Sequence, residues 1–245
     1  MQRRTFLSSS VLSAVALTMK MPAQAAAVKT PSAGIQVINA GIGGNNTADL
    51  LKRMQKDCLD HKPSLTVLMC GTNDMNSMKY IPLEQYKKNM SEIITAIKGT
   101  RSKVLLMTIL PYIEEYLFTR HKKEHYGEEG PSGRRAEVNK TIRALAARHK
   151  TYLLELGSIF EKVGKIGMDK DCLLQNSANT QKTDGVHPTV DGYRVIGLAV
   201  HDFIVYNHLP TEKIVCFGDS ITAGDGGIEK NSYPAFLNRL LQPAV

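Results

Sequence analysis

The chain has 245 residues, of which 42% are hydrophobic and 22% are charged, a composition typical of a globular protein with one full core. We therefore expect a single folded domain. The formal net charge is +8, but the basic residues are scattered beside Glu and Asp. Because no nucleic-acid-binding motif accompanies them, the composition argues against a nucleic-acid partner.

The N-terminus has the pattern of a bacterial export signal. Arg3 and Arg4 resemble a twin-arginine motif and precede an apolar run at residues 6–17, which a small Ala-Gln-Ala sequence at residues 23–25 follows. The run is too short for a membrane-spanning helix, which requires roughly 20 residues. We expect residues 1–25 to be a signal peptide that exports the protein to the periplasm or the cell exterior without membrane insertion. The alternative is a disordered tail.

The remaining domain, residues 26–245, carries a net charge of +5 once the basic residues of the signal are removed. It contains four cysteines, which form no close pair and lack the spacing of a zinc site. We expect free thiols that act as small hydrophobic side chains, with one disulfide as the alternative, at Cys58, Cys70, Cys172 and Cys216.

Five apolar runs rich in β-branched residues predict strands that are buried on both faces. Between the runs, apolar residues recur every three to four positions, as one face of a helix requires. Strands that alternate with helices predict a parallel sheet covered on both sides, the three-layer α/β/α class. The predicted strands are residues 35–39, 65–70, 103–109, 151–156 and 213–217.

Residues 113–135 interrupt this alternation with a stretch rich in Glu, Lys, His and Arg. Long loops in compact domains are often functional, so a lid over the site is one interpretation. We favour a solvated surface loop. Since His121, Glu124 and His125 in this stretch lack the pattern of a metal-ligand set, we expect no metal.

The strongest chemical signal is a predicted strand that ends in Gly218-Asp219-Ser220. Ligands bind at the carboxyl ends of strands in open parallel sheets. The N-terminus of a following helix would place partial positive charge near a developing oxyanion. Turns also favour these three residue types, so a simple turn is the alternative for the triplet alone. We single out Ser220 as the candidate nucleophile.

A serine nucleophile needs a base, and Asp184 and His187 supply a carboxylate and an imidazole three residues apart. In a helical turn the two side chains would lie on one face. Asp184 would then fix the tautomer of His187 and stabilise the imidazolium that forms when Ser220 loses its proton. The alternative is an Asx turn at Asp184, with His187 as a surface histidine.

Acyl transfer also needs hydrogen-bond donors that face the tetrahedral oxyanion. Two loops that follow predicted strands offer candidates: Asn73 comes after residues 65–70, and Gly44 lies in the glycine-rich stretch 39–47. A glycine lets a substrate approach the backbone N–H closely. For Asn73 and Asp74 the alternative is a turn with a helix cap. The glycines lack the spacing of a phosphate-binding loop.

Together these four blocks resemble the SGNH hydrolase family, also called GDSL esterases and lipases. Its members carry a Gly-Asp-Ser nucleophile, an oxyanion glycine, a Gly-x-Asn-Asp segment and an Asp-x-x-His pair. The resemblance implies Ser220 as nucleophile, His187 as base and Asp184 as its orienting partner. It also implies an oxyanion hole made of Gly44, Asn73 and the backbone N–H of Ser220, and it implies no cofactor.

The order of the blocks departs from the family pattern, because the Gly-Asp-Ser block usually comes first and here comes last. An ordinary member that is cut between its first helix and second strand, with its old ends joined, would have this order. If the five-stranded flavodoxin-like sheet of the family is retained, the last strand in the sequence lies inside it. The spatial order is then 1-5-2-3-4 in chain numbering.

The reaction that we expect is hydrolysis of a small acyl ester through an acyl-enzyme, and the substrate that we favour is an O-acetyl group on a carbohydrate. The resemblance also includes lysophospholipases, thioesterases and generic short-chain esterases. A non-catalytic binding protein and an O-acyltransferase are further alternatives. The chain has no tryptophan, so stacking on a sugar would depend on other aromatic side chains, for instance Tyr112, Tyr116 or Tyr126.

Overall fold

The computed structural model describes residues 34–225, 228 and 230–243, and the expected signal peptide lies outside these residues. Within them one parallel sheet has the strand order β1-β5-β2-β3-β4. This confirms the predicted α/β class and strand order, and each strand begins within one residue of its predicted start. The strands are β1 (Gln36–Gly41), β2 (Leu65–Met69), β3 (Lys103–Met107), β4 (Tyr152–Leu154) and β5 (Lys213–Gly218).

The last strand in the chain, β5, lies between β1 and β2. Lys213 is in register with Gln36 of β1, and Ile214 is in register with Leu65 of β2. All residues of β5 after Lys213 are buried, as expected for an apolar run in a sheet that is covered on both faces. The C-terminal part of the chain therefore forms the inside of the sheet.

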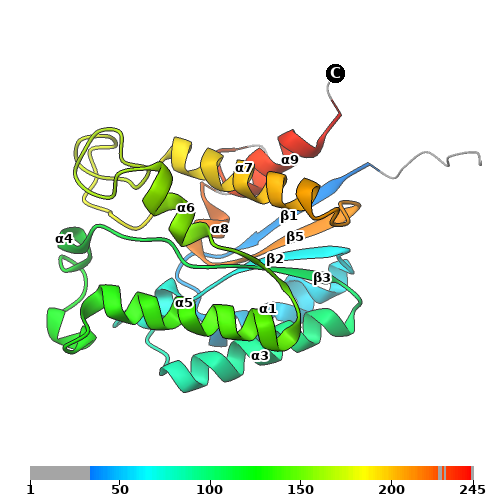
Figure 1. Cartoon of the computed structure of the whole chain (residues 1–245), viewed down its shortest axis with the longest axis horizontal. Coiled ribbons are helices and arrows are strands. Elements are labelled where there is room, and N and C mark those ends of the chain that lie inside the picture. The colour runs from blue at the N-terminus through cyan, green and yellow to red at the C-terminus, as the bar shows by residue number, and fades with distance from the viewer. Residues whose placement is uncertain (1–33, 226–227, 229, 244–245) are drawn as a thin grey trace, which may run out of the picture. The chain divides into compact units, whose positions relative to one another are not determined.

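Helices cover both faces of the sheet (Figure 1). In that view α1, α3 and α5 lie below the sheet, and α6, α7 and α9 lie above it. No helix in the part of the chain that the structure describes has the length and hydropathy to cross a membrane. The helices are α1 (Thr47–Asp57), η1 (Leu59–His61), α2 (Thr72–Met75), α3 (Leu83–Gly99), α4 (Glu114–Leu117), η2 (Lys123–Tyr126), α5 (Gly130–His149), α6 (Leu156–Val163), α7 (Val190–Tyr206), α8 (Ser220–Ala223) and α9 (Tyr233–Leu241).

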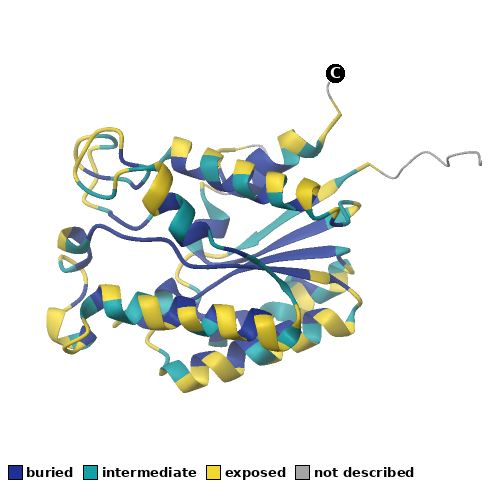
Figure 2. Cartoon of the chain, viewed as in Figure 1, coloured by how far each residue is buried: buried dark blue, intermediate teal, exposed yellow. Residues whose placement is uncertain are grey.

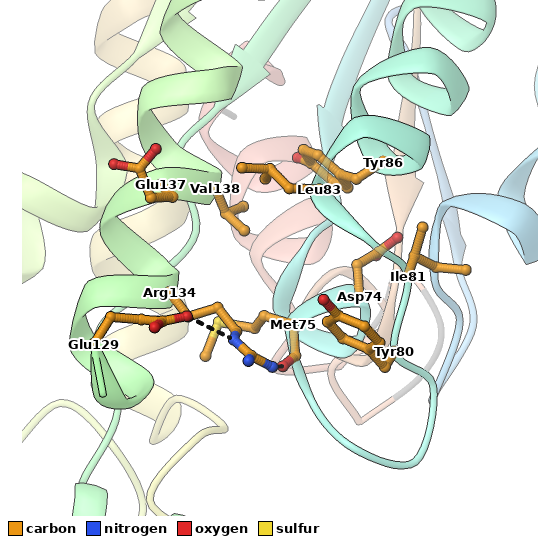
Figure 3. A pocket seen from close by; sticks show the side chains of 10 residues that line it. All are labelled: Asp74, Met75, Tyr80, Ile81, Leu83, Tyr86, Glu129, Arg134, Glu137 and Val138. Carbon is orange, nitrogen blue, oxygen red and sulfur yellow. Dashed lines mark hydrogen bonds and ion pairs between the residues drawn. The ribbon is translucent and has the colours of Figure 1, made fainter. Parts of the chain in front are cut away.

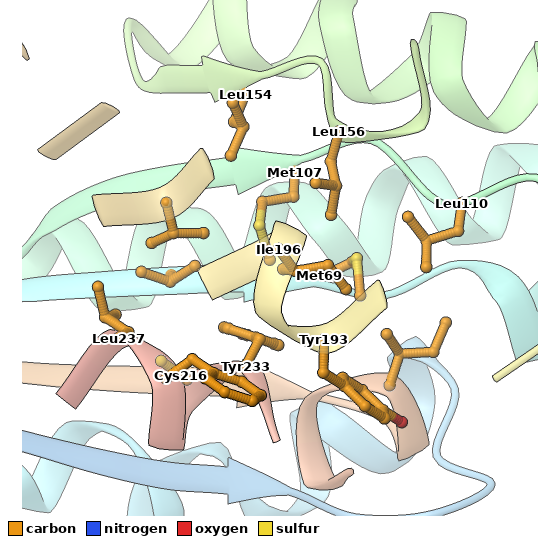
Figure 4. Close-up of a cluster of buried hydrophobic side chains, with 14 of the residues drawn as sticks. Met69, Met107, Leu110, Leu154, Leu156, Tyr193, Ile196, Cys216, Tyr233 and Leu237 are labelled. Carbon is orange, nitrogen blue, oxygen red and sulfur yellow. The ribbon is translucent and has the colours of Figure 1, made fainter. Parts of the chain in front are cut away.

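The core consists of two apolar layers, one on each face of the sheet, and the solvent-facing sides of the helices are exposed (Figure 2). In the layer under α7 and α9, Ile196 and Leu237 pack with Met69 and Met107 from the strands (Figure 4). All four cysteines are buried and free, as predicted. The core therefore supports the sheet on both of its faces.

Residues 113–135 are not the solvated loop that the composition favoured. They contain α4, η2 and the start of α5, and they bury several side chains, among them Ile113, Leu117 and His121. The prediction was wrong because the buried residues follow neither a helical nor a strand period in a segment made of short turns.

The three tyrosines considered for sugar stacking are also buried. Tyr126 has no exposed surface, and Tyr116 and Tyr112 are only 8% and 9% exposed. A stacking platform must present a ring face to the ligand. These side chains therefore belong to the core, and that part of the interpretation was wrong.

Candidate active site

Ser220 directly follows the inner strand β5, at the carboxyl edge of the sheet. Asp219 caps the short helix α8 with its side chain, so Ser220 is the first residue of that helix. The end of β5 lies against α8 at Gly218, where a Cβ atom would be only 2.3 Å from the hydroxyl of Thr222. Only glycine fits there, and the turn holds the Ser220 side chain beyond the end of β5.

The side chains of Ser220, His187 and Asp184 form one chain of hydrogen bonds. His187 Nε2 lies 2.9 Å from Ser220 Oγ, and His187 Nδ1 lies 2.9 and 3.0 Å from the two carboxylate oxygens of Asp184. An ionised carboxylate only accepts, so Nδ1 donates to Asp184, which leaves Nε2 of the neutral ring to accept from the Ser220 hydroxyl. This arrangement suits transfer of a proton from serine to histidine.

Asp184 also shapes the loop that carries the histidine. Its Oδ1 accepts from the backbone N–H groups of Val186 at 2.9 Å and His187 at 2.7 Å, which makes an Asx turn rather than a helical turn. The Asx turn, which was the alternative to the contact between Asp184 and the His187 ring, is thus present together with that contact. Burial alone would raise the pKa of Asp184, but hydrogen bonds from the ring and backbone of His187 outweigh it and hold this pKa well below its ordinary value.

The predicted oxyanion donors lie beside the nucleophile. Gly44 and Asn73 line the same cavity as His187 and Ser220, and its volume is about 480 Å³. Asn73 Nδ2 donates to the carbonyl of Asn45 at 2.9 Å, which ties the two loops together. Gly44 has a φ of 73°, a left-handed conformation that glycine adopts without strain. The structure therefore brings all the predicted site residues to one place.

Asp74 is a buried residue that also links the loop of Asn73 to the loop of Gly44, through Thr47. Its carboxylate accepts from the backbone N–H of Thr47 at 3.0 Å and from the Thr47 hydroxyl at 2.5 Å. The alternative of a helix cap thus applies in part, because Asp74 accepts from the first backbone N–H of α1, whose N-cap residue is Asn46. Asp74 is 1% exposed, and burial raises its pKa although the bonds from Thr47 oppose this.

Arg120 contacts the site, although the sequence did not single it out. Its guanidinium donates to the backbone carbonyl of Asp184 at 2.5 Å, lies 3.9 Å from the Asp184 carboxylate and lines the cavity. It is one of several basic residues in residues 113–135, and nothing local distinguishes it from the others. Only the fold of that segment shows which one reaches Asp184.

The histidines of the same segment are not arranged as a metal site. Among the residues that the structure describes, no group of three or more His, Cys, Asp and Glu side chains is placed to hold a metal ion. His121 Nδ1 lies 2.8 Å from Ser77 Oγ, and His125 packs edge-on against the rings of Tyr80 and Tyr126. Both histidines therefore act in packing and hydrogen bonding.

The buried carboxyl of Asp219 leads to a prediction for stability. Asp219 is 1% exposed, and burial raises its pKa from 3.8 to about 7. Between these values the folded protein keeps a proton that the unfolded chain releases, so the stability of the wild type falls as the pH rises through this window. Asp219→Asn keeps an acceptor for the N–H of Ile221 without the charge. We expect the variant to be more stable than the wild type at pH 8, by about 2 kcal/mol or more, and similar at pH 4.

Urea unfolding at both pH values measures this difference. Asp171→Asn is the matched control, because the Asp171 side chain is 68% exposed and, within the described residues, pairs with Lys165 alone at 3.4 Å. Its stability relative to the wild type should not change with pH. Equal pH profiles for Asp219→Asn and the wild type would show that Asp219 is ionised without penalty.

Comparison with known proteins agrees with this geometry. The model of the GDSL-like lipase/acylhydrolase family matches residues 16–195. The chain is 27% identical over 187 residues to the uncharacterized lipoprotein YqeF of Bacillus subtilis (strain 168), covering 71% of this chain and 76% of that protein. It is 26% identical over 179 residues to an acetylxylan esterase of Geobacillus stearothermophilus, covering 69% of this chain and 72% of the relative.

Solved structures share the fold. A lipase/acylhydrolase from Enterococcus faecalis superposes with a TM-score of 0.53 at 21% identity, covering 69% of this chain and 74% of that one. The acetyl xylan esterase AlAXEase superposes with a TM-score of 0.51 at 23% identity, covering 67% and 79%. Since the family model matches well over half of the sequence, the chain belongs to the GDSL-like lipase/acylhydrolase family and is a carboxylic ester hydrolase of the GDSL type.

Proposed function

We propose that Ser220, His187 and Asp184 are the catalytic triad of this esterase, and that Gly44, Asn73 and the Ser220 N–H form its oxyanion hole. The observation that carries the proposal is the continuous chain of hydrogen bonds from Ser220 Oγ through the imidazole to the carboxylate. The position of Ser220 at the carboxyl end of β5, in a cavity with the two donor loops, supports the same assignment.

In this mechanism His187 Nε2 takes the hydroxyl proton as Ser220 Oγ attacks the carbonyl carbon of the ester. The charge that develops on the carbonyl oxygen is stabilised by the donors of the oxyanion hole. His187 then returns the proton to the leaving alcohol, and the acyl group stays on Ser220. A water molecule, activated by the same imidazole, attacks the acyl-enzyme and releases the carboxylic acid. Asp184 keeps the ring oriented and stabilises the imidazolium throughout.

The lining of the cavity favours a small acyl group on a polar alcohol. A long acyl chain needs an apolar channel, but Met78 and Val186 are the only large apolar side chains among the residues that line this cavity. We propose O-acetyl groups on a carbohydrate as the substrate, which the likeness to an acetylxylan esterase also supports. The polar and basic lining residues include Asn76, Lys79, Arg120 and His121.

Hydrolysis of 4-nitrophenyl esters by residues 26–245, together with acetate release from acetylated xylan, tests this substrate. We expect kcat/KM for the acetyl ester to exceed that for the octanoyl ester by about tenfold or more, since Met78 and Val186 offer a long acyl chain few apolar side chains to pack against. A preference for the octanoyl ester would contradict a carbohydrate ester as the substrate and would favour a lipid ester. Acetyl transfer to an added alcohol in place of water would indicate an acyltransferase. A folded protein that is inactive on every ester would favour a binding protein.

We also propose that the chain is a circular permutant of an ordinary family member. The Gln242 side chain, just after α9, donates to the backbone carbonyl of Ile35, just before β1, at 3.2 Å. An ordinary member would run directly from its first helix into its second strand at this place. The family match at residues 16–195 ends before the Ser220 block, which also supports the proposal.

Export through a signal peptide at residues 1–25 is likewise our proposal. The twin-arginine pattern supports it, and one relative is named a lipoprotein. Sequencing the N-terminus of the protein from the periplasm and the culture medium tests it. An unprocessed protein found only in the cytoplasm would contradict it.

A further inference from the structure

Residues 113–135 contact both loops that carry the proposed catalytic groups. On the histidine side, the backbone N–H of Ile113 donates to the carbonyl of Gly185 at 2.8 Å, and Arg120 donates to the carbonyl of Asp184. These bonds join the start and the middle of the segment to the turn that holds His187. The segment is therefore part of the framework of the site and not a separate surface feature.

On the opposite side, side chains of the segment bond to residues 71–78, the loop with the oxyanion candidate. The hydroxyl of Tyr126 donates to Oδ1 of Asn76 at 2.6 Å, and both residues are buried. Nδ1 of His121 lies 2.8 Å from Oγ of Ser77. A buried hydrogen bond is shielded from competing water and loses more when one partner is removed.

Arg134 reaches the same loop from α5 (Figure 3). Its guanidinium lies over the rings of Tyr80 and Tyr126, at 5.1 and 5.4 Å from their centres. A guanidinium can only donate, so it donates to Nε2 of His125 at 2.9 Å and more weakly to the carbonyl of Met75 at 3.5 Å. One side chain thus links α5, η2 and the loop.

A cavity of about 220 Å³ separates the loop from α5 (Figure 3). Asp74 and Met75 line it on the side of the loop, and Val138 lines it on the side of α5. Direct packing of the loop against α5 is therefore incomplete at this place. Asn73 and Asp74 already tie the loop to residues 45 and 47 on its other side, and the side chains that cross from residues 113–135 hold it on this side.

We propose that Tyr126 and His121 are positioning residues that, with Arg134, form a clasp around the loop and hold the Asn73 amide toward Ser220. The inference rests on the proposed role of Asn73 as an oxyanion donor. Such a donor helps only when it is already aimed at the transition state. A displaced loop therefore stabilises the transition state less while it leaves binding of the substrate unchanged. The effect is a lower kcat with the same KM.

Tyr126→Phe tests the clasp, because it keeps the ring and removes only the hydroxyl. We expect kcat for 4-nitrophenyl acetate to fall about tenfold with KM unchanged. Ser77→Ala should lower kcat in the same direction, and because Ser77 is exposed the change should leave folding intact. Tyr112→Phe is the matched control, since among the described residues the Tyr112 hydroxyl bonds to Ser132 at 3.5 Å and not to residues 71–78. It should keep the kcat of the wild type.

A double-mutant cycle shows whether Tyr126 acts through Asn73. Asn73→Ala alone should lower kcat by about 10²-fold or more, and adding Tyr126→Phe should then have no further effect. If the two effects multiply, the clasp is wrong while the oxyanion assignment stands. If Asn73→Ala leaves kcat unchanged, the oxyanion assignment fails and the clasp fails with it.

Discussion

Ser220→Ala is expected to lower kcat for ester hydrolysis by about 10⁵-fold or more, with little change in stability. Alanine removes the oxygen that attacks the ester, and His187 and Asp184 then have no nucleophile to activate. Steady-state kinetics with 4-nitrophenyl acetate measures the loss. A fluorophosphonate probe, followed by intact mass, should add one label to the wild type and none to the variant.

A serine–histidine pair on another face of the molecule serves as a matched control. Ser91 Oγ lies 2.8 Å from His149 Nε2, a contact as short as the one at Ser220. This pair joins α3 to α5 on the surface, and among the described residues no carboxylate bonds to its imidazole. Ser91→Ala should therefore keep full activity and full labelling. Substantial hydrolysis by Ser220→Ala would falsify the nucleophile assignment.

A chain that ends at Pro210 is expected to lose cooperative folding as well as activity. The missing part contains β5, the only strand that pairs with both β1 and β2. Ile214, Val215 and Phe217 have no exposed surface, and each fully buried side chain of this kind contributes roughly 1.5–3 kcal/mol. That sum is a large share of the 5–15 kcal/mol by which a typical domain is stable. Urea unfolding followed by circular dichroism should show no cooperative transition.

The same residues placed at the other end of the chain should restore the fold. We expect a variant with residues 211–242, a short Gly-Ser linker and residues 35–210, in that order, to unfold cooperatively and to hydrolyse esters. The linker spans the place where Gln242 already contacts Ile35. A chain that ends at Gln242 in the natural order is the control and should fold like the wild type. A soluble, cooperatively folded fragment that ends at Pro210 would contradict the central role of β5.

The sheet could be predicted from the sequence because its strands are continuous apolar runs, and because four sequence blocks together identified a family with a known strand order. Residues 113–135 could not, since their buried side chains occur in short turns without a regular period. Sequence patterns predict helices and strands because buried apolar residues recur in them at a regular period. They fail where an irregular segment packs through a few specific contacts.

The predicted site residues lie together in the structure, but their supporting contacts were not visible in the sequence. Arg120 and Tyr126 act on loops that are more than 40 positions away in the chain, at Asp184 and Asn76. Thr47 likewise meets Asp74 only because two strand ends lie at one edge of the sheet. Such partners depend on the tertiary fold and carry no signal of their own.

The position of β5 also determines when the protein can first become active during synthesis. Gln36 pairs with Lys213, 177 positions later, so the facing edges of β1 and β2 stay unpaired until the ribosome has made residues 213–218. Contacts this far apart in sequence slow folding, and open strand edges invite association with other chains. Ser220, the proposed nucleophile, directly follows the strand that completes the sheet. We therefore expect a nascent chain that lacks β5 to show no ester hydrolysis, so that activity begins only when the sheet is complete.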